Sequence, residues 1–589
     1  MENNLKNVPI YNSKSILKSI KFDDFYFNSI NPIEECEYVY INANNLIKRS
    51  KKVSTLVIGE LGFGVGLNFL TTLKALEKSF KNKFLHYISF EGYPLDVDQL
   101  KNIYLNFPEL QKLSELLIKK LPMKMSGVHD IDFSECNSHL TLVYDKFSSI
   151  KNFSFLADIW YLDGFSPNKN LSAWTEDIFK NIYRNTKHKG TLSTFTSATS
   201  VRKKLINAGF AVTKKKGFSN KREMLIGKKL QINNKMNINT STLNIEPVAI
   251  IGGGITGASL AYSLKKRNIE CFVIEKGSNL GNGASGNLIA FQMPKLTLDG
   301  SIYGVFSLRS FLYSRNLAIN LNSSPDTDGI LVFPNRDRDL IKFKKLLHLN
   351  WPQNLFRNFE DKLFDNYNCV HLFSSSGILE TSKFLKNLTK SVKLITNFNV
   401  CKIEHSSQNK ILYDKEGKYL RAKTVIWCKG FENNINLPQL NIPTSGQVTY
   451  ISEDIDFFDK KFNYSYGNYF SQAVKGVHQI GSTFSKDIHH RNKIYNELNI
   501  KNIPLFLKDN LSQNINIVGS RFSVRSSTSN RLPYFGSLFN NNEYFIGGMG
   551  SWGYTYAPFL SEVLVREILN EPKIIEKNIL QKLNLENRI

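Results

Sequence analysis

Two glycine-rich turns, each placed between an apolar strand and a helix, are the segments of this sequence best suited to chemistry on a nucleotide. The first is Glu60-Leu-Gly62-Phe-Gly64-Val-Gly66 and the second is Gly252-Gly-Gly254-Ile-Thr-Gly257. Glycine lets the backbone approach a ligand closely, and free N–H groups at the start of the next helix bind anionic groups. Both turns therefore predict nucleotide-cofactor sites, although a glycine-rich turn can also be purely structural.

The acids around the first turn favour S-adenosylmethionine (SAM) as its cofactor. Glu60 would repel a pyrophosphate, whereas it would suit the ammonium of a methionine group. Glu91 ends the next apolar strand, where a carboxylate can accept hydrogen bonds from both ribose hydroxyls. Asp145 follows a third strand and is expected near the adenine. The expected SAM-binding residues are Glu60, Gly62, Gly64, Gly66, Glu91 and Asp145.

An acid at the end of an apolar strand is the best candidate for a catalytic group beside this cofactor. In Trp160-Tyr-Leu-Asp163-Gly-Phe-Ser-Pro167 the strand runs directly into Asp163. Ligands of open α/β sheets bind at the carboxyl ends of the strands, so Asp163 is expected in the same crevice as the first glycine turn. Its carboxylate could bind an amine and take its proton, which frees the nitrogen lone pair to attack a sulfonium methyl group. The simpler interpretation is an aspartate that only begins a turn.

The second turn has the complete dinucleotide fingerprint. Glu275 closes the strand after the helix, in the position of the acid that binds the adenosine ribose. A second glycine loop, Gly281-Asn-Gly-Ala-Ser285-Gly286-Asn287, follows, and Gly548-Met-Gly550-Ser-Trp552-Gly553 leads into a last helix. The loop after Glu275 resembles one in flavoproteins of the glycine oxidase and D-amino acid oxidase type, and the last segment agrees, which favours FAD over NAD. The expected FAD-binding residues are Gly252, Gly254, Gly257, Glu275, Ser285, Gly286, Gly548, Gly550 and Gly553.

Arg525 is the expected substrate-binding residue of this second site. It lies in Ser523-Val-Arg525-Ser-Ser-Thr-Ser-Asn-Arg531-Leu-Pro533, which resembles the segment in which the same flavoproteins bind the carboxylate of their substrate. A guanidinium can make two parallel hydrogen bonds to a planar carboxylate. Arg531 is the second candidate, and either arginine could instead form a surface salt bridge or contact a phosphate.

The elements that must position these residues form two βαβ units. One begins at Thr55 and the other at Pro247, and each ends in an acid after its second strand. Residues 229–246 are rich in Asn, Lys and Thr and lack an apolar period, as a linker would. The predicted fold is α/β: a Rossmann-like SAM methyltransferase domain at 1–228, this linker, and an FAD-binding Rossmann domain with a mixed-sheet substrate subdomain at 247–589.

Composition limits the class of protein further. The 589 residues carry 76 Lys and Arg against 51 Asp and Glu, a formal net charge of +25 that favours a polyanionic partner such as nucleic acid. Basic clusters at 202–204, 214–216 and 221–222 could follow its backbone, although the coding bias of an AT-rich genome could also produce the surplus. The six cysteines contain no CxxC pair, and no apolar stretch is long enough to span a membrane. We therefore expect a cytoplasmic protein with no metal site and no membrane contact.

Five segments, taken in order, give the sequence a specific resemblance. They are GELGFGVGLNFL, SFEGYPL, YLDGFSPNKNLSAW, TFTSATSVRKKLINAGF and KKGFSNKREMLIGK. All are similar to the methyltransferase half of the MnmC family, bifunctional bacterial enzymes that make 5-methylaminomethyl-2-thiouridine at the tRNA wobble position. The second half of the chain resembles the same family in the same order. The resemblance implies Gly62, Gly64, Gly66, Glu91 and Asp145 around SAM, and Asp163 at the amine that is methylated.

The same resemblance implies two reactions on the wobble uridine in the anticodon loop of tRNA. The FAD domain would oxidise its carboxymethylaminomethyl group, with Arg525 on the carboxylate, and release glyoxylate. The methyltransferase domain would then methylate the free aminomethyl group. Phe165, Trp174 and Phe218 are possible platforms for base stacking. Trp552 departs from the family, because an arginine is expected at its position, and a monomer is expected.

Two other interpretations of the motifs remain open. A small-molecule amine or amino acid oxidase fused to an unrelated methyltransferase would carry the same motifs and would not need RNA. A tRNA-binding scaffold with decayed nucleotide sites would bind no flavin and transfer no methyl group. The intact glycines of the second turn, together with Glu275 and Asp163, argue against decay.

Overall fold

The computed structural model divides the chain into two compact units, which are described separately. Unit 1 comprises Met1–Ser241 and Arg566–Lys577, and unit 2 comprises Thr242–Val565 and Asn578–Ile589. The predicted linker lies largely outside the described residues. The structure describes residues 5, 10–13, 16–28, 30–80, 83–230, 245–323, 328–334, 336–364, 370–406, 409–432, 440–452, 462–488, 492–508, 515–538, 542–573 and 575–589.

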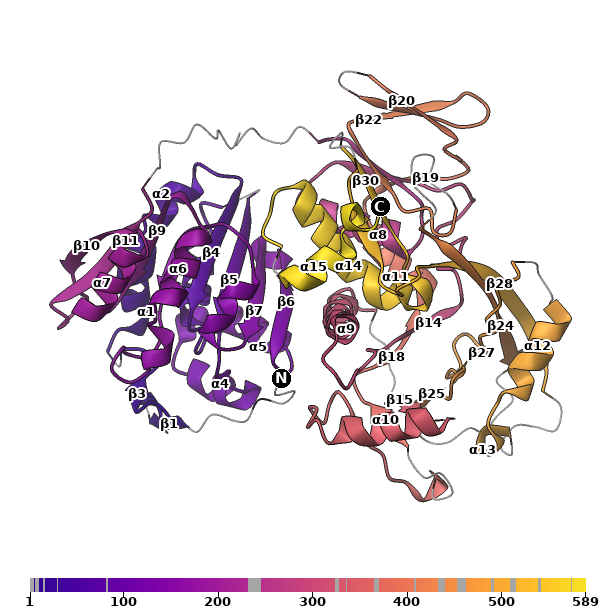
Figure 1. Ribbon diagram of the computed structural model, residues 1–589, viewed down its shortest axis with the longest axis horizontal. Helices are drawn as coiled ribbons and strands as arrows, with labels where there is room; N and C mark the ends of the chain where they lie inside the picture. The colour runs from indigo at the N-terminus through magenta and orange to yellow at the C-terminus, as the bar shows by residue number, and fades with distance from the viewer. Residues whose placement is uncertain are drawn as a thin grey trace. The chain divides into compact units, whose positions relative to one another are not determined.

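Unit 1 is built on an eight-stranded sheet (Figure 1) with the strand order β10-β11-β9-β8-β4-β5-β7-β6. The run from β9 to β7 is parallel, whereas β6 and the β10–β11 hairpin pair antiparallel. Because β4, β5 and β8 are neighbours, their carboxyl ends lie at one edge of the sheet. The strands are β4 (Thr55–Leu61), β5 (Phe84–Phe90), β6 (Gly127–Phe133), β7 (Ser138–Tyr144), β8 (Ala157–Leu162), β9 (Thr186–Thr194), β10 (Ala211–Lys216) and β11 (Glu223–Lys228).

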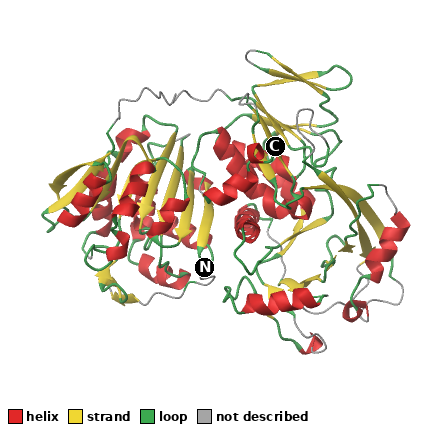
Figure 2. Cartoon of the chain, in the orientation of Figure 1, coloured by secondary structure: helices red, strands yellow, loops and turns green. Residues whose placement is uncertain are grey.

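Helices cover both faces of this sheet, because apolar side chains alternate along buried parallel strands (Figure 2). In β4, Leu56 and Ile58 belong to one core and Val57 to the other. The first core includes residues of α1 to α5, and the second includes residues of α6 and α7. The helices are α1 (Pro32–Cys36), α2 (Leu46–Ser50), α3 (Leu67–Leu76), α4 (Val97–Tyr104), α5 (Gln111–Lys120), α6 (Glu176–Arg184) and α7 (Thr199–Asn207). A small sheet of β1 (Ile10–Ser13), β2 (Ile16–Ser19) and β3 (Asp24–Phe25) precedes them.

Unit 2 begins with a six-stranded sheet in the order β19-β13-β12-β23-β30-β29. All its neighbours are parallel except the pair β29 and β30. The helix α8 (Ile255–Lys265) connects β12 to β13, which completes the second predicted βαβ unit. The strands are β12 (Val248–Ile251), β13 (Cys271–Ile274), β19 (Lys393–Ile395), β23 (Thr424–Trp427), β29 (Tyr534–Gly536) and β30 (Glu543–Gly547).

A second large sheet in unit 2 has eight strands in the order β16-β17-β15-β25-β26-β27-β24-β28. The pair β15 and β25 is parallel and the other pairs are antiparallel. The predicted α/β class with a mixed-sheet subdomain is therefore confirmed. The strands are β15 (Gly329–Val332), β16 (Arg357–Asn358), β17 (His371–Phe373), β24 (Ile442–Ser452), β25 (Phe462–Ser465), β26 (Tyr469–Phe470), β27 (Val477–Gly481) and β28 (Ile517–Ser527).

The remaining elements of unit 2 surround these two sheets. Within the described ranges, no helix is both long enough and apolar enough to span a membrane. The remaining strands are β14 (Ile289–Gln292), β18 (Gly377–Glu380), β20 (Lys402–His405), β21 (Lys410–Tyr413) and β22 (Tyr419–Ala422). The helices are α9 (Ile302–Asn320), α10 (Asp337–Leu347), α11 (Thr381–Leu388), α12 (Asn492–Lys501), α13 (Leu505–Lys508), α14 (Gly553–Ile568) and α15 (Lys577–Leu583).

Unit 1 includes a short segment from near the end of the sequence, Arg566–Lys577. Arg566 Nη1 lies 3.4 Å from Asp130 Oδ1, and Glu571 Oε2 lies 3.0 Å from His86 Nε2. All four side chains are buried, and buried charged groups are tolerated only when they are paired. These polar contacts hold the segment against β5 and β6 of unit 1. The predicted domain boundaries stay a prediction. They assigned this segment to the second domain, whereas the structure groups it with unit 1.

Phe69→Ala is expected to lower the free energy of unfolding of unit 1 by about 3–5 kcal/mol, because it leaves a cavity beneath the sheet. Phe69 is fully buried in α3, and its ring centroid lies 5.0 Å from that of Tyr87 and 5.1 Å from that of Phe133. Urea denaturation followed by circular dichroism measures the change. The control is Leu105→Ala, at a residue that is 80% exposed, which should cost less than about 0.5 kcal/mol. Equal costs for the two variants would contradict the position of Phe69 in the core.

Candidate active sites

The carboxyl ends of β4, β5 and β8 form one side of a cavity of about 780 Å³ in unit 1. Gly62, Glu91 and Asp163 follow these strands and line the cavity. The strand ends are in direct contact, because Gly62 N donates to Phe90 O (2.9 Å) and Asp163 N donates to Leu61 O (2.9 Å). A Cβ at Gly62 would lie 2.0 Å from Asp163 O, so only glycine fits between the two strand ends. The sheet thus brings together three predicted site residues that are distant in sequence.

The first glycine turn is held in place by Glu91. Gly62 has φ 92°, in the left-handed region, and Gly64 and Gly66 also have positive φ. The carboxylate of Glu91 accepts hydrogen bonds from Gly64 N (2.8 Å) and Tyr93 N (2.7 Å). Burial raises the pKa of Glu91, and these N–H donors oppose the shift. Gly66 is the N-cap of α3, so the free N–H groups at the helix start lie beside the cavity.

Asp163 is the carboxylate best placed for proton transfer in this cavity. Its Oδ2 accepts a 2.7 Å hydrogen bond from Asn68 Nδ2, and the side chain is partly exposed where it lines the cavity. Burial raises the pKa of Asp163 to about 6, while the hydroxyl of Tyr40 and the amide of Asn68 oppose the shift. A carboxyl group with this pKa is mostly ionised at neutral pH and can still take up a proton.

Glu60 lies beneath the cavity and not in its lining, which differs from the predicted contact with the ammonium of SAM. Its side chain is buried, and both carboxyl oxygens accept hydrogen bonds: Oε2 from Ser89 Oγ (2.7 Å) and Oε1 from Asn68 Nδ2 (3.0 Å). Burial raises the pKa of Glu60 to about 8, so the group is mostly neutral at pH 7. Asn68 therefore donates both of its N–H groups to carboxyl groups, one from Glu60 and one from Asp163.

Asp145 and Trp174 also lie outside the lining of this cavity. Asp145 is exposed and accepts a 2.7 Å hydrogen bond from Lys146 N, so its predicted contact with the adenine stays a prediction. Trp174 is a core residue whose Nε1 donates to Phe165 O (2.8 Å), which removes it as a stacking platform. Phe165 and Phe218 do line the cavity.

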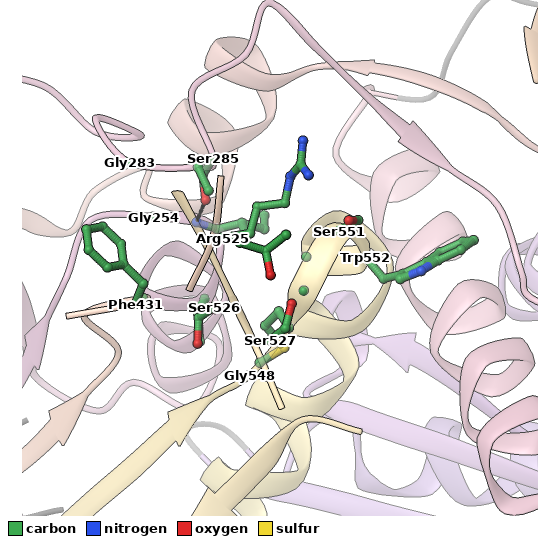
Figure 3. Close-up of a pocket in the computed structure, with 18 of the residues that line it drawn as sticks. Gly254, Gly283, Ser285, Phe431, Arg525, Ser526, Ser527, Gly548, Ser551 and Trp552 are labelled. Carbon is green, nitrogen blue, oxygen red and sulfur yellow. Dashed lines mark hydrogen bonds between the residues drawn. The ribbon is translucent and has the colours of Figure 1, made fainter. Parts of the chain in front are cut away.

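A second cavity, of about 980 Å³, lies in unit 2 (Figure 3). Gly252 and Gly254 line it, and Gly252 has φ 119°. A Cβ at Gly252 would lie 2.5 Å from Cys428 O, so β12 and the end of β23 approach each other only at a glycine. The helix α8 begins directly after Gly254, and Ile255 N donates to Ser285 Oγ (3.0 Å). The helix start and this loop form a site that fits a pyrophosphate.

Of the other residues predicted for this site, some line the cavity and others only allow close backbone packing. Glu275 lines the cavity, and its carboxylate accepts from Gly253 N (2.7 Å) and Gly277 N (2.9 Å). Gly257 and Gly286 do not line the cavity. A Cβ would lie 1.9 Å from a backbone oxygen at Gly257 and 2.0 Å from one at Gly286. Gly257 therefore permits the close packing of α8 against the turn after β12, and Gly286 permits the tight fold of its own loop.

The C-terminal glycine segment forms another wall of this cavity. Gly548, Gly550 and Gly553 all line it, after β30 and at the start of α14. A Cβ on Gly553 would lie 3.4 Å from a side-chain carbon of Ile255, so the starts of α14 and α8 are close together. This arrangement brings the two ends of the unit 2 sequence to one binding site.

Arg525, in β28, lies in the same cavity between the loop of Ser285 and the turn of Trp552 (Figure 3). Its Nη2 donates to Ser482 Oγ (2.7 Å), and its guanidinium carbon lies 4.5 Å from the ring centroid of Phe484. Burial lowers the pKa of Arg525. Arg525 Nη1 is buried and has no hydrogen-bond partner in the part of the chain that the structure describes. A planar anion such as a carboxylate would satisfy it.

Arg531, the second candidate for the carboxylate, is exposed at the edge of the cavity. Sequence reasoning did not single out Asn68, Tyr40 or Ser482. Asn68 carries a local signal, because it is a polar residue on the apolar helix α3 directly after the glycine turn. Tyr40 and Ser482 carry none, since only the tertiary structure brings them to the acidic and basic groups that they contact.

Two family models match parts of the chain, one in each half. Residues 108–230 match a model described as S-adenosyl-L-methionine-dependent methyltransferase, and residues 247–567 match one described as FAD dependent oxidoreductase. The predicted cofactors SAM and FAD are thereby confirmed. The cavities fit them, because Asn68 Oδ1 in the first and Arg525 Nη1 in the second are buried polar atoms without a partner among the described residues.

Relatives that match nearly the whole chain contain both halves. One from Pseudoalteromonas translucida is 28% identical, with 98% of each chain covered. Another, from Marinomonas sp., is 30% identical, with 89% of this chain and 85% of the relative covered. Both are named tRNA 5-methylaminomethyl-2-thiouridine biosynthesis bifunctional protein MnmC. The predicted resemblance is confirmed: the chain belongs to the MnmC family, and its C-terminal half belongs to the family of FAD-dependent oxidoreductases.

Proposed function

We propose that this chain modifies a uridine of tRNA in two consecutive reactions, one in each unit. Unit 2 removes the carboxymethyl part of a 5-carboxymethylaminomethyl group, and unit 1 methylates the amine that remains. The main support for this proposal is that one chain contains both an amine-binding and a carboxylate-binding cavity. One cavity contains a carboxylate suited to an amine, Asp163, and the other contains a buried arginine suited to a carboxylate, Arg525.

The oxidation depends on the position of the substrate carboxylate. Arg525 binds it through Nη1, while Ser482 and Phe484 fix the guanidinium. Bound FAD supplies the acceptor of the two electrons. The carbon next to the carboxylate loses a hydride and the amine nitrogen loses a proton, which leaves a carbon–nitrogen double bond in the substrate. Water adds to that bond, and the carbon–nitrogen bond breaks to give glyoxylate and the primary amine.

The methylation depends on Asp163. Its carboxylate binds the aminomethyl group in its ammonium form and accepts one proton from it, so that the nitrogen lone pair becomes available. Bound SAM supplies the electrophilic methyl group. Asn68 and Tyr40 hold the carboxylate of Asp163 in the ionised form that accepts the proton. The proton then leaves Asp163 to water.

The finer features of the substrate are proposals as well. A uridine at the wobble position of the anticodon loop is already unstacked, so it can enter a cavity and stack on Phe165 or Phe218. The exposed strand β10 ends in Lys214-Lys-Lys216, two residues before Phe218 of the cavity lining, and these lysines follow the RNA backbone. The cytoplasm is the proposed compartment, because it contains tRNA, and a monomer stays a prediction.

The direct test is mass spectrometry of wobble nucleosides after incubation of the purified protein with carboxymethylaminomethyl-modified tRNA. Without SAM, the aminomethyl nucleoside should form, and with SAM the methylaminomethyl nucleoside should form. An unchanged nucleoside from a flavin-loaded protein would contradict the proposal. Faster oxidation of free glycine or sarcosine than of tRNA would favour the small-molecule oxidase.

Asp163→Asn is expected to lower the rate of methyl transfer by about 10²-fold or more, because it removes the proton acceptor. In the unaltered chain, the carboxylate form must be present, so the rate should rise with pH, with a midpoint near the pKa of about 6, and level off above it. Asn68→Ala removes a donor that lowers this pKa, so it should move the midpoint to higher pH. Single-turnover transfer of labelled methyl groups to aminomethyl-tRNA measures both effects. Asp177→Asn, at an exposed residue of α6, is the control, and a loss of the same size there would contradict the role of Asp163.

Arg525→Lys is expected to lower kcat/KM of the oxidation by about 10- to 100-fold, because a point charge cannot replace a bidentate guanidinium. The flavin absorbance of the purified protein should not change, since Arg525 is assigned to the substrate. Glyoxylate release from modified tRNA measures the loss. Arg421→Lys, at an exposed residue of β22, is the matched control. An unchanged kcat/KM for Arg525→Lys would assign the carboxylate to another residue.

A further inference from the structure

A group of basic side chains lines the opening of the flavin cavity in unit 2. We refer to Lys295, Arg336, Arg338 and Arg531 as the rim. The three arginines are exposed and the lysine is half-buried, so the rim lies where the cavity meets the solvent. Arg336 and Arg338 come from the start of α10, whereas the other two residues come from loops that are far from α10 in the sequence. Only the folded chain forms this positive surface.

Asp339 neutralises the rim only in part. Arg336 Nε lies 3.9 Å from Asp339 Oδ2, the limit of an ion pair. Lys295, Arg338 and Arg531 form no salt bridge with any described residue. Burial lowers the pKa of Lys295, the nearby Lys342 and Arg531 add to this shift, and Asp339 opposes it. Positive groups that repel one another are stabilised when an anion binds between them.

The acidic residues that line the same cavity belong to the nucleotide end and are already engaged. Glu275 accepts hydrogen bonds from two backbone N–H groups, and Glu432 is paired with Lys276. The substrate carboxylate has its own partner in Arg525. A small amino acid would therefore leave the rim without an anionic partner, whereas a nucleic acid has a phosphate at every nucleotide.

Aromatic side chains accompany the rim. Lys295 Nζ lies 4.9 Å from the ring centroid of Tyr303, whose hydroxyl is 3.4 Å from that of Tyr556. Trp552 stacks on Tyr556, with ring centroids 6.0 Å apart and planes 19° apart. Trp552 is half-buried, lines the cavity, and extends to one side of it in Figure 3. Aromatic faces beside cations are the usual composition of sites for single-stranded nucleic acid.

We propose that the rim and Trp552 form a binding surface for a single-stranded RNA segment at the mouth of the flavin cavity. The rim binds the phosphates that flank the modified uridine, and Trp552 stacks on a neighbouring base. The uridine substituent then extends inward to Arg525. This inference rests on the proposed function and adds to it the residues by which unit 2 distinguishes an RNA substrate from a free amino acid.

The first test compares RNA binding by the full, flavin-loaded chain and by Arg336→Gln/Arg338→Gln/Arg531→Gln. The probe is an unmodified, fluorescently labelled anticodon stem-loop, and its affinity is measured by anisotropy between ~50 and ~200 mM salt. Each phosphate contact on single-stranded RNA contributes about 0.7 to the slope of log affinity against log salt, so the slope should fall by about 2. The control, Lys383→Gln/Lys390→Gln/Lys415→Gln, removes three exposed charges of unit 2 that do not line the cavity. An unchanged slope for the rim variant, or an equal fall for the control, would overturn the proposal.

The second test concerns Trp552 and uses turnover. Trp552→Ala should lower kcat/KM for modified tRNA by about 10-fold through loss of stacking, whereas Trp552→Phe should keep most of it. With the free nucleoside 5-carboxymethylaminomethyluridine as substrate, both variants should match the unaltered chain. Equal losses on tRNA and nucleoside would mean that Trp552 supports the fold or the flavin and would overturn its role in stacking.

Failure of this inference differs from failure of the proposed function. If the unaltered chain converts modified tRNA and the rim variant keeps the same salt slope, the function stands and the rim is rejected. If the rim variant binds the stem-loop with the lower slope but the unaltered chain converts no modified tRNA, the surface stands and the proposed reaction is rejected.

Discussion

The close approach of backbone segments at the carboxyl ends of parallel strands is the constraint on which both sites depend. At Gly62 a Cβ would lie 2.0 Å from Asp163 O, and at Gly252 it would lie 2.5 Å from Cys428 O. Any side chain there would separate the strand ends and move the groups that follow them. Because ligands of such sheets bind beyond these ends, the contact that closes the fold also sets the width of each cavity.

Different degrees of burial give Glu60 and Asp163 of unit 1 different pKa values. Asp163 and Glu60 both bond to Asn68, but Glu60 is fully enclosed and Asp163 is partly exposed. The pKa of Glu60 is therefore raised to about 8 and that of Asp163 only to about 6. One group stays protonated near neutral pH and can share an amide without repulsion, while the other is ionised and faces the cavity. Asn68 donates to both the protonated Glu60 and the ionised Asp163.

In unit 2 the mixed sheet adds a function that the nucleotide-binding sheet lacks. The long antiparallel pair of β24 and β28 carries Arg525 into a cavity whose other walls come from glycine turns. Glycine turns can accommodate phosphates and a flat ring, but they offer no cation for a substrate carboxylate. In the proposed function, one sheet therefore binds the cofactor and the other orients the substrate.

The α/β class and the two cofactors could be predicted from the sequence, and the same patterns supplied the catalytic candidates. Glycine spacing, the acid after each second strand and the strand that ends in Asp163 are local patterns, and local backbone chemistry decides them. The pattern could not place Glu60 beneath the cavity, Asp145 outside it or Trp174 in the core, because burial depends on which elements pack above a strand end. Nor could it assign Arg566–Lys577 to unit 1 or gather Lys295, Arg336, Arg338 and Arg531 at one opening. Those features join residues from distant segments, so only the tertiary structure, which sets distances and desolvation together, decided them.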